Sequence, residues 1–231
     1  MSAGLPDGEP PHAGVLIPWA NTVVEAELHR VTRQSVSWHY ARLVPASRTT
    51  GLDARFLEGL LEAVPGALGQ LSALPLRCAY LACTSVAFMY PESMEAARRQ
   101  VRLPLVSAFD AITMVLSRLA AGHIALLTPY PDDVTEAEAR MFCHSGIAVT
   151  GWANLGLDDG YDTITGAQVK ELIEKVSCAA IDKAEAIVLS CTGWPTFDLI
   201  PELRKRLGKP VISSNLAIGW HAQQARRPDA I

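Results

Sequence analysis

The sequence predicts an α/β protein with two pseudo-symmetric lobes, each a mostly parallel sheet flanked by helices, and an active site between the lobes. Three observations support this prediction. Short apolar runs alternate with helix-like stretches, the alternation occurs twice, and one cysteine phrase recurs at the same place in both halves. Alternating strands and helices are typical of a parallel sheet that is covered by helices.

The expected strands are short apolar runs rich in β-branched residues, which favour a pleated, buried backbone. They cover residues 15–17, 36–43, 78–82, 105–106, 124–127, 148–152, 186–189 and 211–212. Helices are expected between most of these runs, and several begin near Asp, Asn, Ser or Thr, whose side chains cap a first turn. The expected helices cover residues 21–32, 54–71, 93–100, 110–120, 133–143, 166–180 and 201–206.

Three pairs of segments repeat at a spacing of about 110 residues. Residues 18–27 parallel 129–138, residues 82–85 parallel 190–193, and residues 103–108 parallel 209–214. This spacing is too long for a solenoid repeat and indicates two similar lobes.

The lobe boundary is expected near residues 117–122. The predicted domains are a flexible arm over 1–13, a first α/β lobe over 14–117 plus 215–231, and a second α/β lobe over 118–214. The arm mixes Pro, Gly, Asp and Glu without an apolar stretch. The final segment, from residue 215 to about 225, is expected to pack back against the first lobe.

The composition is that of an ordinary globular protein. Of 231 residues, 49% are hydrophobic and 19% are charged, and the formal net charge is −4. Nucleic acid is therefore not an expected partner. No stretch approaches 18 uninterrupted apolar residues, and the first residues lack the apolar core of a secretory signal, so we expect a cytoplasmic protein without a membrane partner.

No cofactor or metal is expected. The five cysteines lack Cys-x-x-Cys spacing, the histidines lack His-x-x-x-His spacing, and no glycine-rich nucleotide loop or Gly-x-Ser-x-Gly elbow occurs. The expected partner is a small carboxylate substrate, and a homodimer and a homotetramer are both compatible with the sequence.

Cys83 and Cys191 are the candidate catalytic residues. They lie in the phrases Ala-Cys-Thr-Ser and Ser-Cys-Thr-Gly, each at the end of an apolar run. A single cysteine in such a place is usually a small buried hydrophobe. The duplication favours function, because two lobes can place two thiols on opposite walls of one cleft. We expect nearby backbone amides to lower both thiol pKa values from about 8.5.

The candidate substrate-binding residues follow expected strands, at the carboxyl edge where open α/β sheets bind ligands. Backbone amides and hydroxyls in both cysteine phrases are suited to hold a carboxylate without Lys or Arg. Asn21 and Tyr130 lie in turns that open helices, where turn formation and capping explain them equally well. The candidates are Asn21, Thr84, Ser85, Tyr130, Thr192 and Gly193.

At these positions the chain resembles the aspartate/glutamate racemase superfamily and, within it, the maleate cis-trans isomerase and arylmalonate decarboxylase branch. The resemblance spans most of the chain. It rests on residues 15–18 with 21–22, 83–85, 128–130 with 133–134, 155–157, 190–193, and 208–211 with 213–215.

The resemblance implies a two-lobed fold with a cofactor-free site between the lobes. It implies that Cys83 is a nucleophile, which in the isomerases adds to an alkene carbon, and that Cys191 is a general acid/base. Asn21 and Tyr130 would bind substrate carboxylates together with the amides that follow each cysteine.

Departures from the family patterns bear on the substrate. Trp19-Ala20 replaces the small residues usual in the isomerases, and Gly160 stands where they have asparagine, which counts against maleate. Arylmalonate decarboxylases have glycine at the position of Cys83. Three functions are therefore considered: first an isomerase or racemase of a small carboxylic or dicarboxylic acid, then an arylmalonate-type decarboxylase with Cys191 as proton donor, then a noncatalytic carboxylate-binding or redox-sensing protein.

Overall fold

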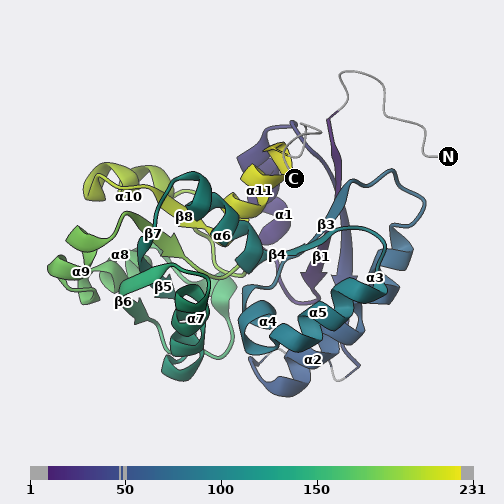
Figure 1. Cartoon of the computed structure of the whole chain (residues 1–231), viewed down its shortest axis with the longest axis horizontal. Coiled ribbons are helices and arrows are strands. Elements are labelled where there is room, and N and C mark those ends of the chain that lie inside the picture. Colours follow the sequence, from purple (N-terminus) through teal and green to yellow (C-terminus); the bar gives the residue numbers. More distant parts are fainter. Residues whose placement is uncertain (1–9, 47, 49–50, 225–231) are drawn as a thin grey trace.

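The computed structural model describes residues 10–46, 48 and 51–224 of the chain. Two four-stranded sheets, in which all paired strands run parallel, form two lobes that lie side by side (Figure 1). The strand orders, β2-β1-β3-β4 and β6-β5-β7-β8, are the same order shifted by four strands. The predicted fold class and its internal duplication are confirmed.

The first sheet is built from the N-terminal half of the chain. Its strands are β1 (His12–Pro18), β2 (Ser37–Leu43), β3 (Cys78–Leu81) and β4 (Leu105–Ser107). The helices of this half are α1 (Val24–Thr32), α2 (Ala54–Glu62), α3 (Val64–Gln70), α4 (Thr84–Met89), α5 (Pro91–Gln100) and α6 (Ala108–Arg118).

The second sheet repeats the plan. Its strands are β5 (His123–Thr128), β6 (Ala148–Asn154), β7 (Ala186–Leu189) and β8 (Val211–Ser213). The accompanying helices are α7 (Asp132–His144), the 3-10 turn η1 (Tyr161–Thr163), α8 (Gly166–Lys175), α9 (Cys178–Lys183), α10 (Ile200–Leu207) and α11 (Ser214–Gln224).

The helices differ from expectation at four places, one of which is α11, a helix over the final segment that was not among those expected. The stretch 54–71 forms two helices, because Pro65, near the start of α3, cannot donate the backbone hydrogen bond that would continue α2. The stretch 166–180 also divides, since the Ser177 side chain caps a new helix at Ala180 N. The short helix α4, directly after Cys83, was not expected.

The predicted domains include both ends of the chain, of which the structure describes only a part. Residues 1–9 of the expected arm and residues 225–231 of the expected first lobe lie outside the described residues. Strand β1 already begins at His12, inside the expected arm, because it pairs there with Ser37 of β2. The division at 117/118 and 214/215 stays a prediction.

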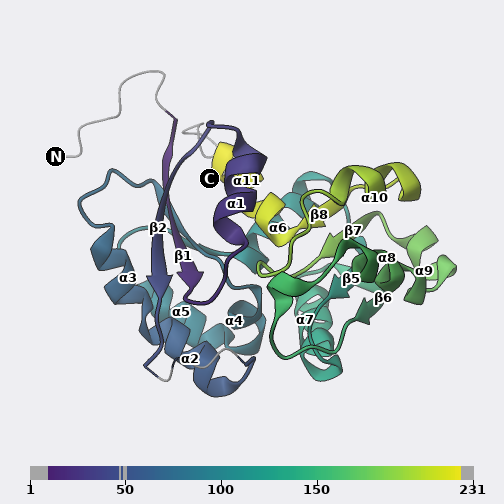
Figure 2. The same ribbon diagram turned by 180° about the vertical axis from the view of Figure 1, so that it is seen from behind.

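Helices α6 and α11 cross between the lobes and pack against each other, and α11 also packs against α1 (Figure 2). Gly219 permits this close packing, because a Cβ atom there would lie 2.4 Å from Val31 Cγ1 of α1. One continuous apolar core runs through both lobes, and a second core lies under α2, α3 and α5. None of the helices in the described part of the chain has the length and apolar character needed to cross a bilayer.

Candidate active site

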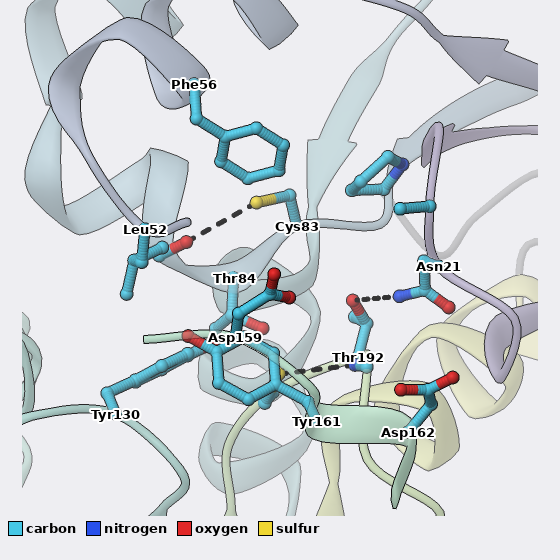
Figure 3. Close-up of a pocket in the computed structure, with 15 residues that line it drawn as sticks. Asn21, Leu52, Phe56, Cys83, Thr84, Tyr130, Asp159, Tyr161, Asp162 and Thr192 are labelled. Atoms are coloured by element: carbon cyan, nitrogen blue, oxygen red, sulfur yellow. Dashed lines mark hydrogen bonds between the residues drawn. The ribbon is translucent and has the colours of Figure 1, made fainter. Parts of the chain in front are cut away.

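A cavity of about 90 Å³ lies where the carboxyl ends of the two sheets face each other (Figure 3). Since one water molecule needs roughly 10–15 Å³ of such space, it has room for several waters or for a small organic acid. All the predicted site residues line it, and they come from both lobes. They are Asn21, Cys83, Thr84, Ser85, Tyr130, Cys191, Thr192 and Gly193.

Cys83 follows β3 and is the residue from which α4 begins. Its sulfur lies 3.4 Å from Ser85 Oγ, and the backbone N–H groups of Ser85 and Val86 are also directed at it. The side chain is buried, and burial raises the thiol pKa although these three donors lower it. The sulfur is therefore protonated in the free protein.

Cys191 follows β7 in the other lobe. Its sulfur accepts the Gly193 N–H at 3.2 Å and a hydrogen bond from Tyr130, but burial dominates and raises the thiol pKa to about 12. The Cys83 sulfur contributes to this upward shift, which places the two thiols within electrostatic reach of each other.

The expectation of lowered thiol pKa values is wrong for the free protein. The expected amides are present at both sulfurs, but burial of the side chains disfavours a thiolate more than the amides favour it. A neutral thiol with a high pKa is suited to donate a proton to a carbanion that forms beside it.

Asn21 supports the start of α1 and links that helix to the second cysteine phrase, while its role in substrate binding stays a prediction. Its Oδ1 accepts the N–H groups of Val23 (2.9 Å) and Val24 (3.2 Å), which caps the start of α1. Its Nδ2 donates to Thr192 Oγ1 at 3.3 Å, and that hydroxyl donates onward to Ala82 O at 2.8 Å. The amide group therefore joins the entrance of α1 to both cysteine phrases.

Tyr130 is almost fully buried and stands edge-on to Tyr161, with ring centroids 5.7 Å apart. Burial raises its pKa well above the ordinary value, so the phenol keeps its proton and serves as a hydrogen-bond donor toward the Cys191 sulfur.

Several cavity residues escaped the sequence-based reasoning. Pro18 ends β1 and belongs, with Ala20, to the repeated segment 18–27, whereas five others lie outside the repeated segments. The set comprises Pro18, Ala20, Leu52, Phe56, Asp159, Tyr161 and Asp162. The loop that carries the last three is joined to the first lobe by two hydrogen bonds. Leu52 N donates to Asp158 O at 3.1 Å, and Thr22 Oγ1 donates to Asp162 Oδ2 at 3.2 Å.

Among the described residues, those that line the cavity include no Lys, Arg or His. The neutral donors that a carboxylate in the cavity could meet are the Asn21 amide, the Thr84 and Ser85 hydroxyls, and backbone N–H groups, whereas the Thr192 hydroxyl already donates to Ala82 O. Searched over the same residues, His, Cys, Asp and Glu form no group of three or more that could bind a metal ion.

Comparisons with known proteins identify the family. The arylmalonate decarboxylase family model matches residues 67–231. The chain is 30% identical over 222 residues to arylmalonate decarboxylase of Bordetella bronchiseptica, covering 92% of this chain and 89% of that protein. It is 27% identical over 114 residues to maleate isomerase of Nocardia farcinica, covering 48% of this chain and 44% of that protein.

A solved structure from the same branch has the same fold. It is a Cys→Ser variant of the Nocardia farcinica maleate cis-trans isomerase with a covalently bound succinylcysteine intermediate, and it matches with a TM-score of 0.82 and 19% identity over 91% of this chain and 90% of that one. From the match over residues 67–231 and the relative that is 30% identical along nearly the whole chain, the protein belongs to the arylmalonate decarboxylase family.

Proposed function

We propose that this protein is a cofactor-independent isomerase or racemase of a small carboxylic or dicarboxylic acid, with Cys83 as nucleophile and Cys191 as general acid/base. The observation that carries the proposal is the presence of two thiols, one from each lobe, in a single cavity whose lining combines neutral hydrogen-bond donors with two acidic residues, Asp159 and Asp162. A substrate carbon held between them has a reactive sulfur on each side.

The surroundings of the two thiols support these different roles. Three donors are directed at the Cys83 sulfur, so it is better prepared to carry negative charge. Cys191, with a pKa raised to about 12, is better prepared to hold and donate a proton. The Cys83 thiol transfers its proton to a substrate carboxylate as the substrate binds, which leaves the thiolate, and it regains that proton when the product is released.

For an alkene diacid, the Cys83 thiolate forms a C–S bond to one alkene carbon, and the π electrons move toward the carboxylate on the other carbon. Cys191 protonates that carbon, and the carbon–carbon bond, which is now single, rotates. The reverse steps then expel Cys83 and return the proton to Cys191. For a chiral acid, Cys83 removes the α proton and Cys191 delivers one to the opposite face. Backbone amides and hydroxyls beside both cysteines would stabilise the negative charge.

The Nocardia farcinica isomerase variant with a succinylcysteine intermediate provides a chemical precedent for a nucleophilic cysteine on this fold. It supports the addition step without identifying the substrate of this protein.

A decarboxylase of a malonate-type acid is the second candidate, and the family match over residues 67–231 favours it. In that reaction the substrate loses carbon dioxide, and Cys191 protonates the carbanion that remains. Cys83 takes no part in the proton transfer, so its replacement by glycine should preserve carbon dioxide release.

Incubation in deuterated water, followed by proton NMR, separates these candidates. The substrates are maleate, single enantiomers of α-substituted acids, and arylmalonates. Conversion of maleate to fumarate, or deuterium entry with loss of chirality, supports the proposal if both Cys83→Ser and Cys191→Ser abolish it. Carbon dioxide release that survives Cys83→Gly supports the decarboxylase. Turnover that persists in Cys191→Ser overturns both, and ligand binding without turnover indicates a noncatalytic protein.

A further inference from the structure

The segment after Cys191 is supported differently from the segment after Cys83. Helix α4 begins at Thr84, directly after Cys83. In the described part of the second lobe, no helix begins after Cys191 until α10, at Ile200. The backbone groups of residues 191–199 therefore depend for their position on partners elsewhere in the chain.

Glu27 supplies much of that support from the first lobe. Its Oε1 accepts the backbone N–H groups of Thr196 at 2.6 Å and Phe197 at 2.7 Å, and its Oε2 accepts from Asn215 Nδ2 at 2.8 Å. The side chain lies on α1 and is 5% exposed. A buried carboxylate is costly unless donors surround it, and here the donors belong to the loop and to α11.

The start of α11 extends this network to the cysteine. Asn215 Nδ2 also donates to Thr192 O at 3.1 Å, and Ser214 Oγ accepts the Cys191 N–H at 3.1 Å. Two side chains therefore connect α1 to the site. Asn21 caps the start of the helix, and Glu27 lies one turn further along it. A shift of α1 would move the Asn21 amide and the Cys191 loop together.

We propose that Glu27 is a positioning residue for Cys191. Its carboxylate holds the 191–199 loop in the conformation in which the Gly193 N–H faces the sulfur and water is excluded from the thiol. This inference rests on the proposed function for its catalytic meaning, because Cys191 is the general acid/base there. The first lobe then controls the geometry of the second lobe's thiol through one buried side chain.

Glu27→Gln tests the proposal, and Asp198→Asn is the matched control. Glutamine has nearly the same size but only one acceptor oxygen, so its NH₂ group must face either the Thr196 and Phe197 N–H groups or Asn215 Nδ2. Asp198 lies on the same loop and pairs with Arg30 of the same helix, but with both side chains exposed. The measurement is the rate at which iodoacetamide alkylates Cys83 and Cys191 in the folded protein at pH 8, followed peptide by peptide by mass spectrometry.

We expect Glu27→Gln to raise the Cys191 rate at least about 5-fold and to change the Cys83 rate less than about 2-fold, because the loosened loop opens locally to water and reagent. Asp198→Asn should leave both rates within about 2-fold, since exposed ion pairs contribute little. A parallel rise at both cysteines in Glu27→Gln would show general destabilisation and overturn the proposal. Unchanged rates at both cysteines would also overturn it.

Asn215→Ala keeps the inference testable if Glu27→Gln fails to fold. It leaves the two backbone amides on Glu27 and removes the link from Glu27 to Thr192 O, and the same selective rise at Cys191 is expected. Alkylation requires no substrate. The positioning role can therefore fail while Cys191→Ser still abolishes turnover, or hold while the proposed reaction fails.

Discussion

The two cysteine regions begin with nearly the same four residues but are held by different means. After β3, the chain turns directly into α4, and local amides and the Ser85 hydroxyl surround the Cys83 sulfur. After β7, the chain forms an irregular loop whose supports, Glu27, Ser214 and Asn215, are distant in sequence. A duplicated motif can thus keep its chemistry while one copy depends on local structure and the other on tertiary contacts.

The largest predicted effect on stability concerns Glu138, whose buried carboxyl accepts a hydrogen bond from Ser190, the residue before Cys191. Ser190 occupies the position that Ala82 has in the first cysteine phrase. It donates this hydrogen bond to Glu138, and burial raises the pKa of the Glu138 carboxyl from 4.5 to about 8. The folded protein therefore holds a proton that the unfolded chain releases above about pH 4.5. Stabilisation is complete below that pH, is lost as the pH rises to about 8, and stays lost above it.

Glu138→Gln should remove this pH dependence. The wild type should lose on the order of 4 kcal/mol more unfolding free energy than the variant between pH 4.5 and 8, because each pKa unit corresponds to about 1.4 kcal/mol. Urea unfolding of both proteins across this range measures the difference. Parallel pH profiles would contradict a buried, proton-loaded Glu138.

Gly193→Ala should damage the Cys191 site selectively. A Cβ atom there would lie 3.3 Å from Tyr161 Cδ2 and in contact with the Cys191 sulfur at 3.5 Å, so the tyrosine ring beside the thiol must move by a few tenths of an ångström. Turnover should fall about 10- to 100-fold, since small displacements of reacting groups are costly. Ser85→Ala, at the equivalent place in the first phrase, removes only a 3.4 Å contact to Cys83 and should cost less. An equal or larger loss of turnover in Ser85→Ala would contradict the expected difference between the two cysteine regions.

Ser214→Ala tests the contact that joins the two regions. Ser214 Oγ accepts the buried Cys191 N–H at 3.1 Å and lies 3.1 Å from Thr84 Oγ1. Its loss should lower the unfolding free energy by about 1–3 kcal/mol, the cost of an unpaired buried group. Urea unfolding checks this value, with the exposed Ser145→Ala as the control, expected to change stability by less than about 0.5 kcal/mol. Equal losses of unfolding free energy in Ser214→Ala and Ser145→Ala would show that the Ser214 contacts do not stabilise the protein more than an exposed serine does.

Asn21→Asp and Asn21→Ala should separate capping from binding, with the smallest effect on stability. Aspartate keeps the oxygen that caps Val23 and Val24 but loses the Nδ2 donor, whereas alanine loses both. Thermal unfolding should show Asn21→Ala about 1 kcal/mol less stable and Asn21→Asp nearly unchanged. Both should raise KM for the substrate. An unchanged KM in both would remove Asn21 from the binding site.

Much of the fold could be predicted from the sequence because strand and helix periods are local signals. The repeated phrases also predicted a shared site, because equivalent strand ends in two lobes face a common cleft. The eight predicted residues do line one cavity. Leu52, Phe56 and Tyr161 were not predictable in this way, because they lie outside the repeated segments and only the tertiary fold, including the bond from Leu52 N to Asp158 O across the lobes, brings them to the site. Glu27 looked like an ordinary helix residue, and only its buried partners reveal its position.

The most direct test of the account is chemical bridging of the two thiols. In a protein with the exposed Cys143 and Cys178 replaced by serine, dibromobimane, which becomes fluorescent when its two bromomethyl groups alkylate two neighbouring thiols, should bridge Cys83 and Cys191. We expect Cys83→Ser and Cys191→Ser each to abolish the bridge, and the bridged protein to have no turnover. Bridging that survives either substitution, or turnover that continues in the bridged protein, would contradict a shared site between the two lobes.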